Sequence, residues 1–268
     1  MSYFNDKVVI VTGGTDGIGR ALVQRLLDSG AKVVTCGRSH DKLYSLQTSF
    51  ANKPFIGTVT DVSNEGECAK LIETAIKTFG RIDILINNAG ISMRALFNDT
   101  SLDTIRRVMD INFWGAVYCT KYALPHIIKS KGTVAGISSI AGYRGLPGRS
   151  GYSASKHALQ GWLEALRTEM LDSGVNVMWA CPGFTTSNIR NTALNAEATQ
   201  QGESPMDESD MMTAEECAMH IMNAIEKRKR TLVLTAQGKR TIFMNRFLPS
   251  IADRLVKKFF IKNGELVK

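Results

Sequence analysis

The strongest constraint on the fold of this chain is a regular alternation of short apolar runs with longer amphipathic stretches. Strand-like runs lie at about 7–12, 31–36, 54–60, 82–86, 132–138, 175–181 and 231–235. Helical patterns lie between them at about 18–29, 39–50, 64–79, 101–130, 151–173 and 213–229. Strands joined by right-handed helical crossovers form a parallel sheet with helices on both faces. The sequence therefore predicts an α/β protein with a doubly wound parallel sheet of about seven strands, and 268 residues suffice for one such domain.

The first apolar run passes directly into a glycine-rich turn and the start of a helix. Gly13, Gly17 and Gly19 give the spacing G-x-x-x-G-x-G. Glycine allows a tight turn and a close approach of the backbone to a ligand, and the free N–H groups at a helix start can bind a phosphate. Such a turn can also be a plain turn, but its position between a strand and a helix favours dinucleotide binding.

Tyr152 and Lys156 place a phenol and an amine four residues apart at the start of a helical pattern. Residues at i and i+4 share a helix face. A tyrosine normally keeps its proton until about pH 10, and a nearby ammonium can stabilise the phenolate enough for acid–base work at lower pH. An ordinary exposed pair on one helix face is the alternative. Ser139 follows the run 132–138, at the sheet edge where ligands bind, so its hydroxyl can meet the phenol over a substrate.

These segments, with others between them, resemble in their order the motifs of the short-chain dehydrogenases/reductases. The resemblance spans essentially the whole chain and rests on Thr12-Gly13-Gly14-Thr15-Asp16-Gly17-Ile18-Gly19, Asp61-Val62, Asn87-Asn88-Ala89-Gly90, Asn112, Ser139, Tyr152-Ser153-Ala154-Ser155-Lys156 and Pro182-Gly183. Residues 87–94, 152–157 and 182–189 further resemble the branch that contains dehydrogenase/reductase member seven. The resemblance implies a Rossmann-type sheet and an oxidoreductase that transfers a hydride between a nicotinamide cofactor and a carbonyl or secondary alcohol.

The resemblance also implies roles for the catalytic candidates. Tyr152 donates the proton to the carbonyl oxygen in reduction, and Ser139 hydrogen-bonds the same oxygen. Lys156 lowers the pKa of the phenol and holds the nicotinamide ribose. Asn112 matches the position that holds a water between the lysine and solvent, although a helix asparagine satisfied by backbone groups is the alternative. Ser138 is expected to face the other side of its strand and to be replaceable.

The cofactor candidates fall into groups along the chain. The resemblance implies the following set: Thr12, Gly13, Gly17, Ile18 and Gly19 in the turn, Asp61 and Val62 beside the adenine, Asn88, Ala89 and Gly90 beside the ribose, and Ser187 at the carboxamide, with Tyr152 and Lys156. Thr185 and Thr186 are close enough to replace Ser187. Arg38, after the second strand, can pair with a 2′-phosphate, whereas an acidic residue there would bind a free 2′-hydroxyl. NADP(H) is therefore favoured over NAD(H), although Asp16 stands where NADP-preferring relatives often carry a neutral or basic residue.

The last third of the chain departs from the strand–helix rhythm. Polar residues dominate 187–212, which predicts a lid over the site within a catalytic domain of residues 1–240. Residues 241–268 are expected to form a basic amphipathic extension, because 227–268 carry twelve Lys or Arg against two acids, a net +10 in a chain of net +8. Its apolar residues recur at helical spacing and can pack on the domain or on a sister subunit of a homodimer or homotetramer. The basic face can also rest on an anionic membrane or contact nucleic acid without sequence specificity.

Composition narrows the setting and the substrate. The five cysteines are scattered without a C-x-x-C pair, which indicates neither a disulfide framework nor a metal site and favours a cytoplasmic protein. Neither a signal peptide nor an apolar run long enough to span a bilayer is expected. Five apolar side chains favour a partly apolar ketone or aldehyde as the substrate: Phe184, Met93, Leu96, Met211 and Met212.

Two other classes of protein remain as alternatives. A non-catalytic dinucleotide-sensing protein could use the same fold, but the presence of every catalytic residue type argues against it. A sugar-nucleotide epimerase or dehydratase would need a larger substrate domain after the sixth strand than the remaining residues can build.

Overall fold

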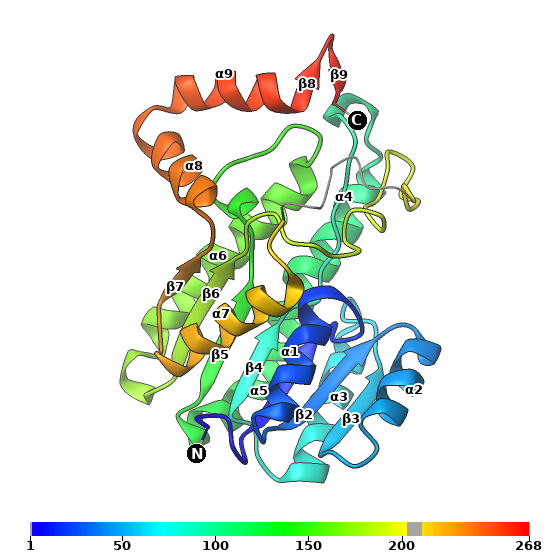
Figure 1. Ribbon diagram of the computed structural model, residues 1–268, viewed down its shortest axis with the longest axis vertical. Helices are drawn as coiled ribbons and strands as arrows, with labels where there is room; N and C mark the ends of the chain where they lie inside the picture. Colours follow the sequence, from blue (N-terminus) through cyan, green and yellow to red (C-terminus); the bar gives the residue numbers. More distant parts are fainter. Residues whose placement is uncertain (1, 203–210, 268) are drawn as a thin grey trace.

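The computed structural model describes residues 2–202 and 211–267. Across these residues, seven strands form one parallel sheet in the order β3-β2-β1-β4-β5-β6-β7 (Figure 1). The strands are β1 Val8–Thr12, β2 Lys32–Gly37, β3 Phe55–Val59, β4 Ile84–Asn87, β5 Thr133–Ile137, β6 Asn176–Cys181 and β7 Thr231–Val233. The predicted doubly wound parallel sheet is confirmed.

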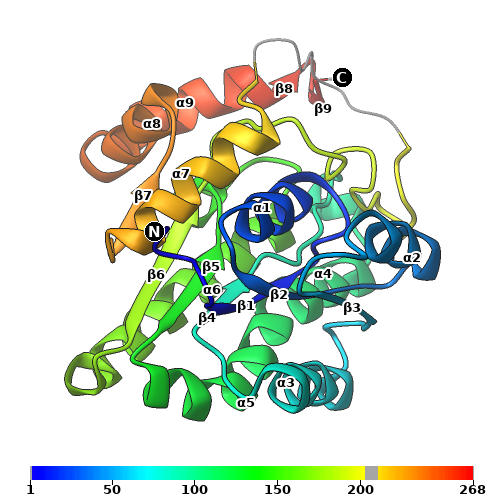
Figure 2. The same ribbon diagram turned by 60° about the horizontal axis from the view of Figure 1, so that its bottom comes forward.

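Helices cover both faces of the sheet (Figure 2). They are α1 Gly17–Asp28, α2 His40–Ser49, α3 Glu65–Phe79, α4 Leu102–Met109, α5 Gly115–Ser130, α6 Ser150–Glu169, α7 Ala214–Glu226, α8 Ala236–Phe247 and α9 Pro249–Phe260. The helical pattern expected over 101–130 is α4 and α5 joined by the π-helical segment Asp110–Trp114. Helices α1 and α7 pack on one face, and α3, α5 and α6 contribute to the core on the other.

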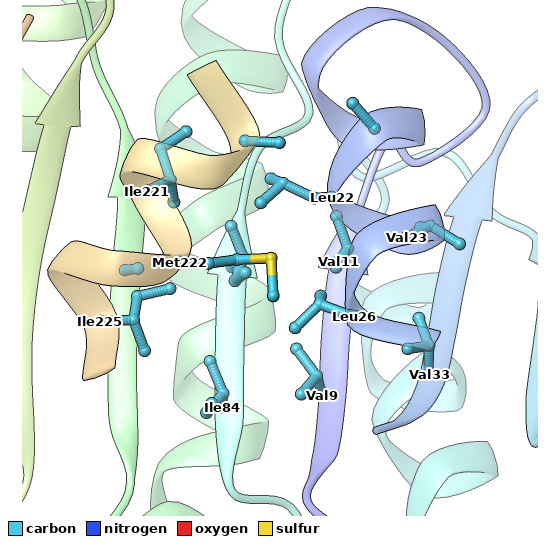
Figure 3. Packing of buried hydrophobic residues seen from close by; sticks show 14 of the residues in the cluster. Val9, Val11, Leu22, Val23, Leu26, Val33, Ile84, Ile221, Met222 and Ile225 are labelled. Carbon is cyan, nitrogen blue, oxygen red and sulfur yellow. The ribbon is translucent and has the colours of Figure 1, made fainter. Parts of the chain in front are cut away.

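The central strands read as continuous apolar runs because both of their faces are buried. In β1, Val9 and Val11 face the core beneath α1 and α7, while Ile10 between them faces the opposite core. Figure 3 shows the first of these cores, where Leu22 and Leu26 of α1 lie over the sheet next to residues of α7. The period of two along each strand therefore fixes which helices each side chain meets.

The strand order also determines where a ligand can bind. Strand β1 pairs with β2 on one side and with β4 on the other, so the direction of winding reverses between β1 and β4. Open α/β sheets bind ligands outside the carboxyl ends of the strands at such a reversal. Thr12 ends β1 and Asn87 ends β4, which brings the glycine-rich turn and the segment Asn88-Ala89-Gly90 to this point.

The chain after β7 forms two helices and a small hairpin. Helix α8 runs across residue 240, where the boundary of the catalytic domain was expected, and α9 provides the expected amphipathic helix. Strands β8 Ile261–Lys262 and β9 Glu265–Leu266 pair antiparallel around Asn263 and Gly264, both at positive φ. The hairpin was not predicted, although Asn-Gly is the dipeptide that favours such a turn. Among the described helices, none is both long and apolar enough to cross a membrane.

Candidate active site

The glycine-rich turn after β1 brings backbone against the start of α1. Gly13 and Gly17 have φ of +67° and +50°, a region that side chains strain to adopt. A Cβ on Gly19 would lie 2.3 Å from the Gly13 carbonyl oxygen, so no other residue fits there without a shift of the backbone. Asp16 caps α1 by accepting a 2.8 Å hydrogen bond from Gly17 N. The next free N–H groups of the helix can then face an anion, so the turn fits the phosphates of a dinucleotide.

Thr12 and Asn88 tie this turn to the end of β4. The Thr12 hydroxyl accepts hydrogen bonds of 3.0 Å from the backbone N–H groups of Asn88 and Ala89. The Asn88 amide in turn donates to the carbonyls of Thr12 and Gly13 at 2.9 and 3.1 Å. Thr12 itself does not line the cleft defined below. It supports the turn from behind instead of forming the direct contact that was expected for a cofactor residue.

The end of β2 carries two cations toward the same cleft. Arg38 is exposed there, and Lys42 of α2 makes an ion pair of 2.8 Å with Asp16. Burial opposes ionisation of Asp16, but the hydrogen bond and charge of Lys42 lower the pKa of this carboxyl overall. Lys42 therefore compensates the negative charge of Asp16, which by itself would disfavour binding of a 2′-phosphate.

Tyr152 and Lys156 lie on the face of α6 that meets the end of β5. Both are nearly buried, with exposed fractions of 8% and 4%. The Lys156 ammonium lies 5.6 Å from the centre of the Tyr152 ring and donates a 2.9 Å hydrogen bond to the Ile137 carbonyl. Ser139, two residues beyond Ile137, caps a short 3-10 turn by accepting from Ala141 N at 3.1 Å. The three candidates thus meet where a strand end and a helix start converge.

The protonation states at this point follow from burial. Burial raises the pKa of Tyr152 above its ordinary value, while a hydrogen bond with Ser139 and the positive charge of Arg149 oppose the rise. Burial lowers the pKa of Lys156 to about 8. The phenol therefore holds its proton near neutral pH, as a proton donor must. The expected lowering of the phenol pKa by Lys156 stays a prediction.

Asn112 joins three parts of the structure from within the π-helical segment. Its amide nitrogen donates to the Ile91 carbonyl at 2.9 Å and to the Ser155 hydroxyl at 3.0 Å, and its oxygen accepts from Ile91 N at 2.8 Å. Only 1% of its surface is exposed. These bonds fit the alternative of an asparagine satisfied by backbone groups, and π-helical turns often mark functional sites. A Cβ on Gly90 would lie 3.2 Å from Asn112 Oδ1 and 3.4 Å from Lys156 Nζ, so Asn112 stands close to the lysine.

A single cleft of about 890 Å³ collects nearly all of the candidates. It is lined by Gly13, Gly17, Ile18, Gly19, Arg38, Asp61, Val62, Asn88, Ala89, Gly90, Ser139, Tyr152, Lys156 and Ser187. The two remaining candidates, Thr12 and Asn112, lie directly behind this lining. Ser187 lies against Gly17, because a Cβ added to Gly17 would be 3.1 Å from the Ser187 Cβ. The volume falls within the range of ligand and cofactor sites, roughly 300–1,000 Å³.

The apolar residues that line the cleft differ from those that were expected. Of the five apolar residues expected to favour the substrate, Phe184 lines the cleft, whereas Met93 is fully buried in a small core with Tyr152 and Leu194. Met212 packs against the core beneath α1 and α7. Further apolar surface of the cleft comes from the tail and from two loops: Leu146, Leu194, Met244, Leu255, Val256, Phe259 and Phe260. Sequence alone gave no sign that α8 and α9 fold back over the site.

Arg149 and Ser138 make contacts at the site that the sequence analysis did not predict. Arg149 lines the cleft just before α6, and its charge opposes the rise in the pKa of Tyr152. Its position three residues before Tyr152, which places the two residues close together at a helix start, is the feature of the sequence that could have indicated this contact. Ser138 was expected to face the other side of its strand, but it lines the same cleft as Ser139, is buried, and accepts a 2.8 Å hydrogen bond from Gln160 of α6. It therefore holds α6 against β5 and supports the catalytic helix.

The expected lid at about 187–212 is described in part, since residues 203–210 lie outside the described residues. Its first part runs along the segment after Gly90, where Leu194 N donates to the Ser92 carbonyl at 2.9 Å and Arg94 N donates to the Leu194 carbonyl at 2.8 Å. Its far end is held by a 2.9 Å hydrogen bond from Thr186 N to the Met212 carbonyl. Ser187, Arg190 and Leu194 of this segment line the cleft.

The sheet, the phosphate-binding turn and the Ser139, Tyr152 and Lys156 cluster define a dinucleotide-dependent oxidoreductase of the doubly wound class. A family model described as short chain dehydrogenase matches residues 7–198. Dehydrogenase/reductase SDR family member 7B of Mus musculus is 37% identical over 242 residues, which cover 87% of this chain and 75% of that protein. Dehydrogenase/reductase SDR family member 7 of Homo sapiens is 37% identical over 220 residues, which cover 79% of this chain and 65% of that protein. The chain belongs to the short-chain dehydrogenase/reductase family, in the branch of member 7, and this confirms the resemblance seen in its motifs.

The fold agrees with solved structures of the same family. A short chain dehydrogenase/reductase of Burkholderia phymatum, in complex with NAD, has a TM-score of 0.84 and 22% sequence identity, and the match covers 94% of this chain and 96% of that one. A short-chain dehydrogenase of Streptomyces avermitilis has a TM-score of 0.80 and 24% identity over the same shares of both chains. Membership of the family makes this chain an NAD(P)-dependent oxidoreductase that acts on CH–OH groups by hydride transfer.

Proposed function

We propose that the protein is an NADP(H)-dependent reductase of partly apolar ketones or aldehydes, which also runs in the direction of alcohol oxidation. The observation that carries the cofactor preference is the pair of cations at the end of β2. Arg38 follows the strand, and the residues on either side of it in the sequence are not acidic. Lys42 pairs with Asp16 of the glycine-rich turn and compensates its negative charge. A guanidinium can hold a 2′-phosphate with two N–H groups, and an ammonium nearby adds to the attraction.

The chain's own residues divide the work of the reaction. When bound, the nicotinamide supplies or accepts the hydride. Tyr152 keeps its proton because it is buried, and gives it to the carbonyl oxygen as charge develops there. Ser139 shares a hydrogen bond with the phenol and stabilises the same oxygen. Lys156, fixed by the Ile137 carbonyl, is positioned to hold the nicotinamide ribose and to replace the proton lost by the phenol.

The cleft supports a substrate with an apolar portion. Leu146 and Leu194 flank the catalytic tyrosine, and Met244, Leu255 and Phe259 extend apolar surface toward the tail. Burial of such surface contributes roughly 25 cal/mol per Å² of binding free energy. We therefore expect turnover to improve as the carbon chain or ring system of the carbonyl substrate grows.

The setting that we propose is a cytoplasmic homodimer or homotetramer. All five cysteines are free and buried, which suits a reducing compartment, and assembly into oligomers is typical of the family.

A panel of ketones and aldehydes of increasing apolar size, followed by NADPH and by NADH absorbance, tests the reaction itself. Reduction of at least some members, faster with NADPH, is the expected result. Tight cofactor binding without turnover of any member would instead favour the dinucleotide-sensing alternative.

Arg38→Asp tests the cofactor preference. Because a partner of the 2′-phosphate becomes a group that repels it, we expect the ratio of NADPH to NADH affinity to fall at least about tenfold in binding titrations. Arg106→Asp is the matched control, since Arg106 is an exposed arginine of α4 that does not line the cleft. If Arg38→Asp leaves the ratio of NADPH to NADH affinity unchanged, another residue distinguishes the 2′-phosphate from the 2′-hydroxyl, and Lys42 is the next candidate.

A further inference from the structure

The outer face of α8 and α9 combines exposed apolar side chains with positive charge. We define the tail surface as these apolar residues together with the basic ones beside them: Phe243, Phe247, Leu248, Ile251, Leu255 and Phe259, with Arg246, Arg254, Lys257, Lys258 and Lys262. Phe247 is 61% exposed and Phe243 58%, whereas large apolar side chains of a packed domain are normally buried. Exposed apolar side chains gathered on two neighbouring helices point to an interaction surface.

The inner face of the same helices is already held by the catalytic domain. Arg144 makes an ion pair of 2.6 Å with Asp253 of α9 and donates a 2.9 Å hydrogen bond to Asn245 of α8. Asn245 donates in turn to the Tyr143 carbonyl at 2.8 Å, and Ala252 is the buried residue of α9. The hairpin fixes the far end of the tail, because Leu266 packs on Gly148. The orientation of α8 and α9 is therefore set, while the apolar side chains of the tail surface stay about half exposed.

The charge of the tail surface points to an anionic partner. Residues 236–267 carry seven Lys or Arg against two acids, and one of those acids, Asp253, is bound by Arg144. A second copy of the chain related by two-fold symmetry would bring these cations together with their own equivalents, which is unfavourable. Negatively charged lipid headgroups over an apolar layer match both features of the surface, since aromatic and aliphatic side chains enter the boundary while lysines and arginines stay among the headgroups.

We propose that the tail surface docks on an anionic lipid bilayer and lies in its interface, with α8 and α9 parallel to the membrane plane. Figure 1 shows the two helices across one end of the molecule. Residues of both helices line the cleft. Leu255 and Phe259 line the cleft while remaining 48% and 51% exposed, so the rim of the cleft is continuous with the docking surface. An apolar substrate can pass from the lipid to the cleft along this rim. Docking does not depend on the proposed reductase activity, whereas entry from the lipid does.

Vesicle sedimentation tests the docking directly. The full chain is mixed with vesicles of phosphatidylcholine alone and with vesicles that also contain phosphatidylserine, at low and high salt. We expect sedimentation with the anionic vesicles at low salt, and release at high salt. Recovery of the protein in the supernatant with anionic vesicles at low salt, or equal binding to both kinds of vesicle at both salt concentrations, would overturn the proposal.

Matched variants locate the contact. Phe247→Ser with Ile251→Ser removes apolar groups, and Arg254→Gln with Lys257→Gln removes charge; none of these four residues lines the cleft. Each pair should weaken partitioning into anionic vesicles at least about tenfold. The controls are Leu171→Ser, an equally exposed apolar residue outside the tail, and Lys121→Gln with Lys129→Gln on α5, which should bind like the wild type. Undiminished binding by the two tail variants would exclude the tail surface as the contact.

Two further measurements distinguish membrane docking from loss of the fold and from an interface between copies of this chain. Unchanged NADPH affinity in each variant, read by cofactor fluorescence, shows that the fold and the cofactor cleft are intact. Light scattering reports the mass in solution. If Phe247→Ser with Ile251→Ser converts an oligomer to monomers and the wild type does not sediment with anionic vesicles, the tail surface is an interface between copies of this chain and the proposal fails.

Discussion

At the scale of single residues, burial changes the proton affinity of both Tyr152 and Lys156. Tyr152 is almost fully covered, and this covering raises its pKa, while Ser139 and Arg149 act in the opposite direction. Lys156 is covered as well, and its pKa falls to about 8. The two pKa values, nearly equal in water, therefore move apart, so the phenol holds its proton more strongly than the lysine does.

Tyr152→Phe removes that proton and little else. We expect the turnover of whichever carbonyl substrate the wild type reduces to fall roughly 100-fold or more, with cofactor affinity close to that of the wild type. Steady-state kinetics beside cofactor titration checks both parts. The exposed Tyr44→Phe on α2 serves as the control and should retain full activity. Turnover above a tenth of wild type, a loss of less than about 1.4 kcal/mol, would contradict the assigned role.

At the scale of elements, Asn112 links the segment after β4 to the catalytic helix. Its three hydrogen bonds reach the backbone of Ile91 and the side chain of Ser155, two elements that line or support the cleft. The motif predicted that Asn112 holds a water between the lysine and solvent; the structure places Asn112 close to Lys156, and its water-holding role stays a prediction. Its bonding pattern could not be predicted, because it depends on how the π-helical segment Asp110–Trp114 rotates the side chain toward Ile91.

Asn112→Ala should lower the free energy of unfolding by about 2–4 kcal/mol, since it leaves buried donors and acceptors of Ile91 unpaired. Urea unfolding followed by circular dichroism measures the change. Asn98→Ala removes an asparagine on the surface and should alter stability by less than about 0.5 kcal/mol. If Asn112→Ala were as stable as the wild type but inactive, the water-holding role suggested by the family motif would be the better account.

At the scale of the whole molecule, the two apolar cores on either side of the sheet contain buried thiols. Cys217 of α7 is fully buried in the core that also contains Leu22 and Leu26, and burial raises the pKa of its thiol to about 12. In the unfolded chain the same thiol loses its proton near pH 9, the ordinary value for cysteine. Between these values the folded state binds more protons than the unfolded state, so stability falls as pH rises.

Cys217→Ala should therefore flatten part of the alkaline loss of stability. Between pH 8 and pH 10 a single thiol of this kind contributes a loss of about 1.4 kcal/mol, which the variant should no longer show. Urea unfolding of both proteins at the two pH values gives the difference directly. Equal losses in variant and wild type would mean that the thiol ionises alike in the folded and unfolded states.

The sequence by itself determined the strand–helix order, the parallel sheet, the glycine-rich turn and the Ser139, Tyr152 and Lys156 cluster. These follow from local periodicity and from motifs whose spacing is short, so each can be recognised within a few tens of residues. Tertiary structure alone decided that Lys42 neutralises Asp16, that Arg149 faces the phenol, and that α8 and α9 line the cleft in place of Met93, Leu96, Met211 and Met212. These contacts join residues far apart in the chain, and their geometry depends on packing of the whole domain, which no local pattern encodes.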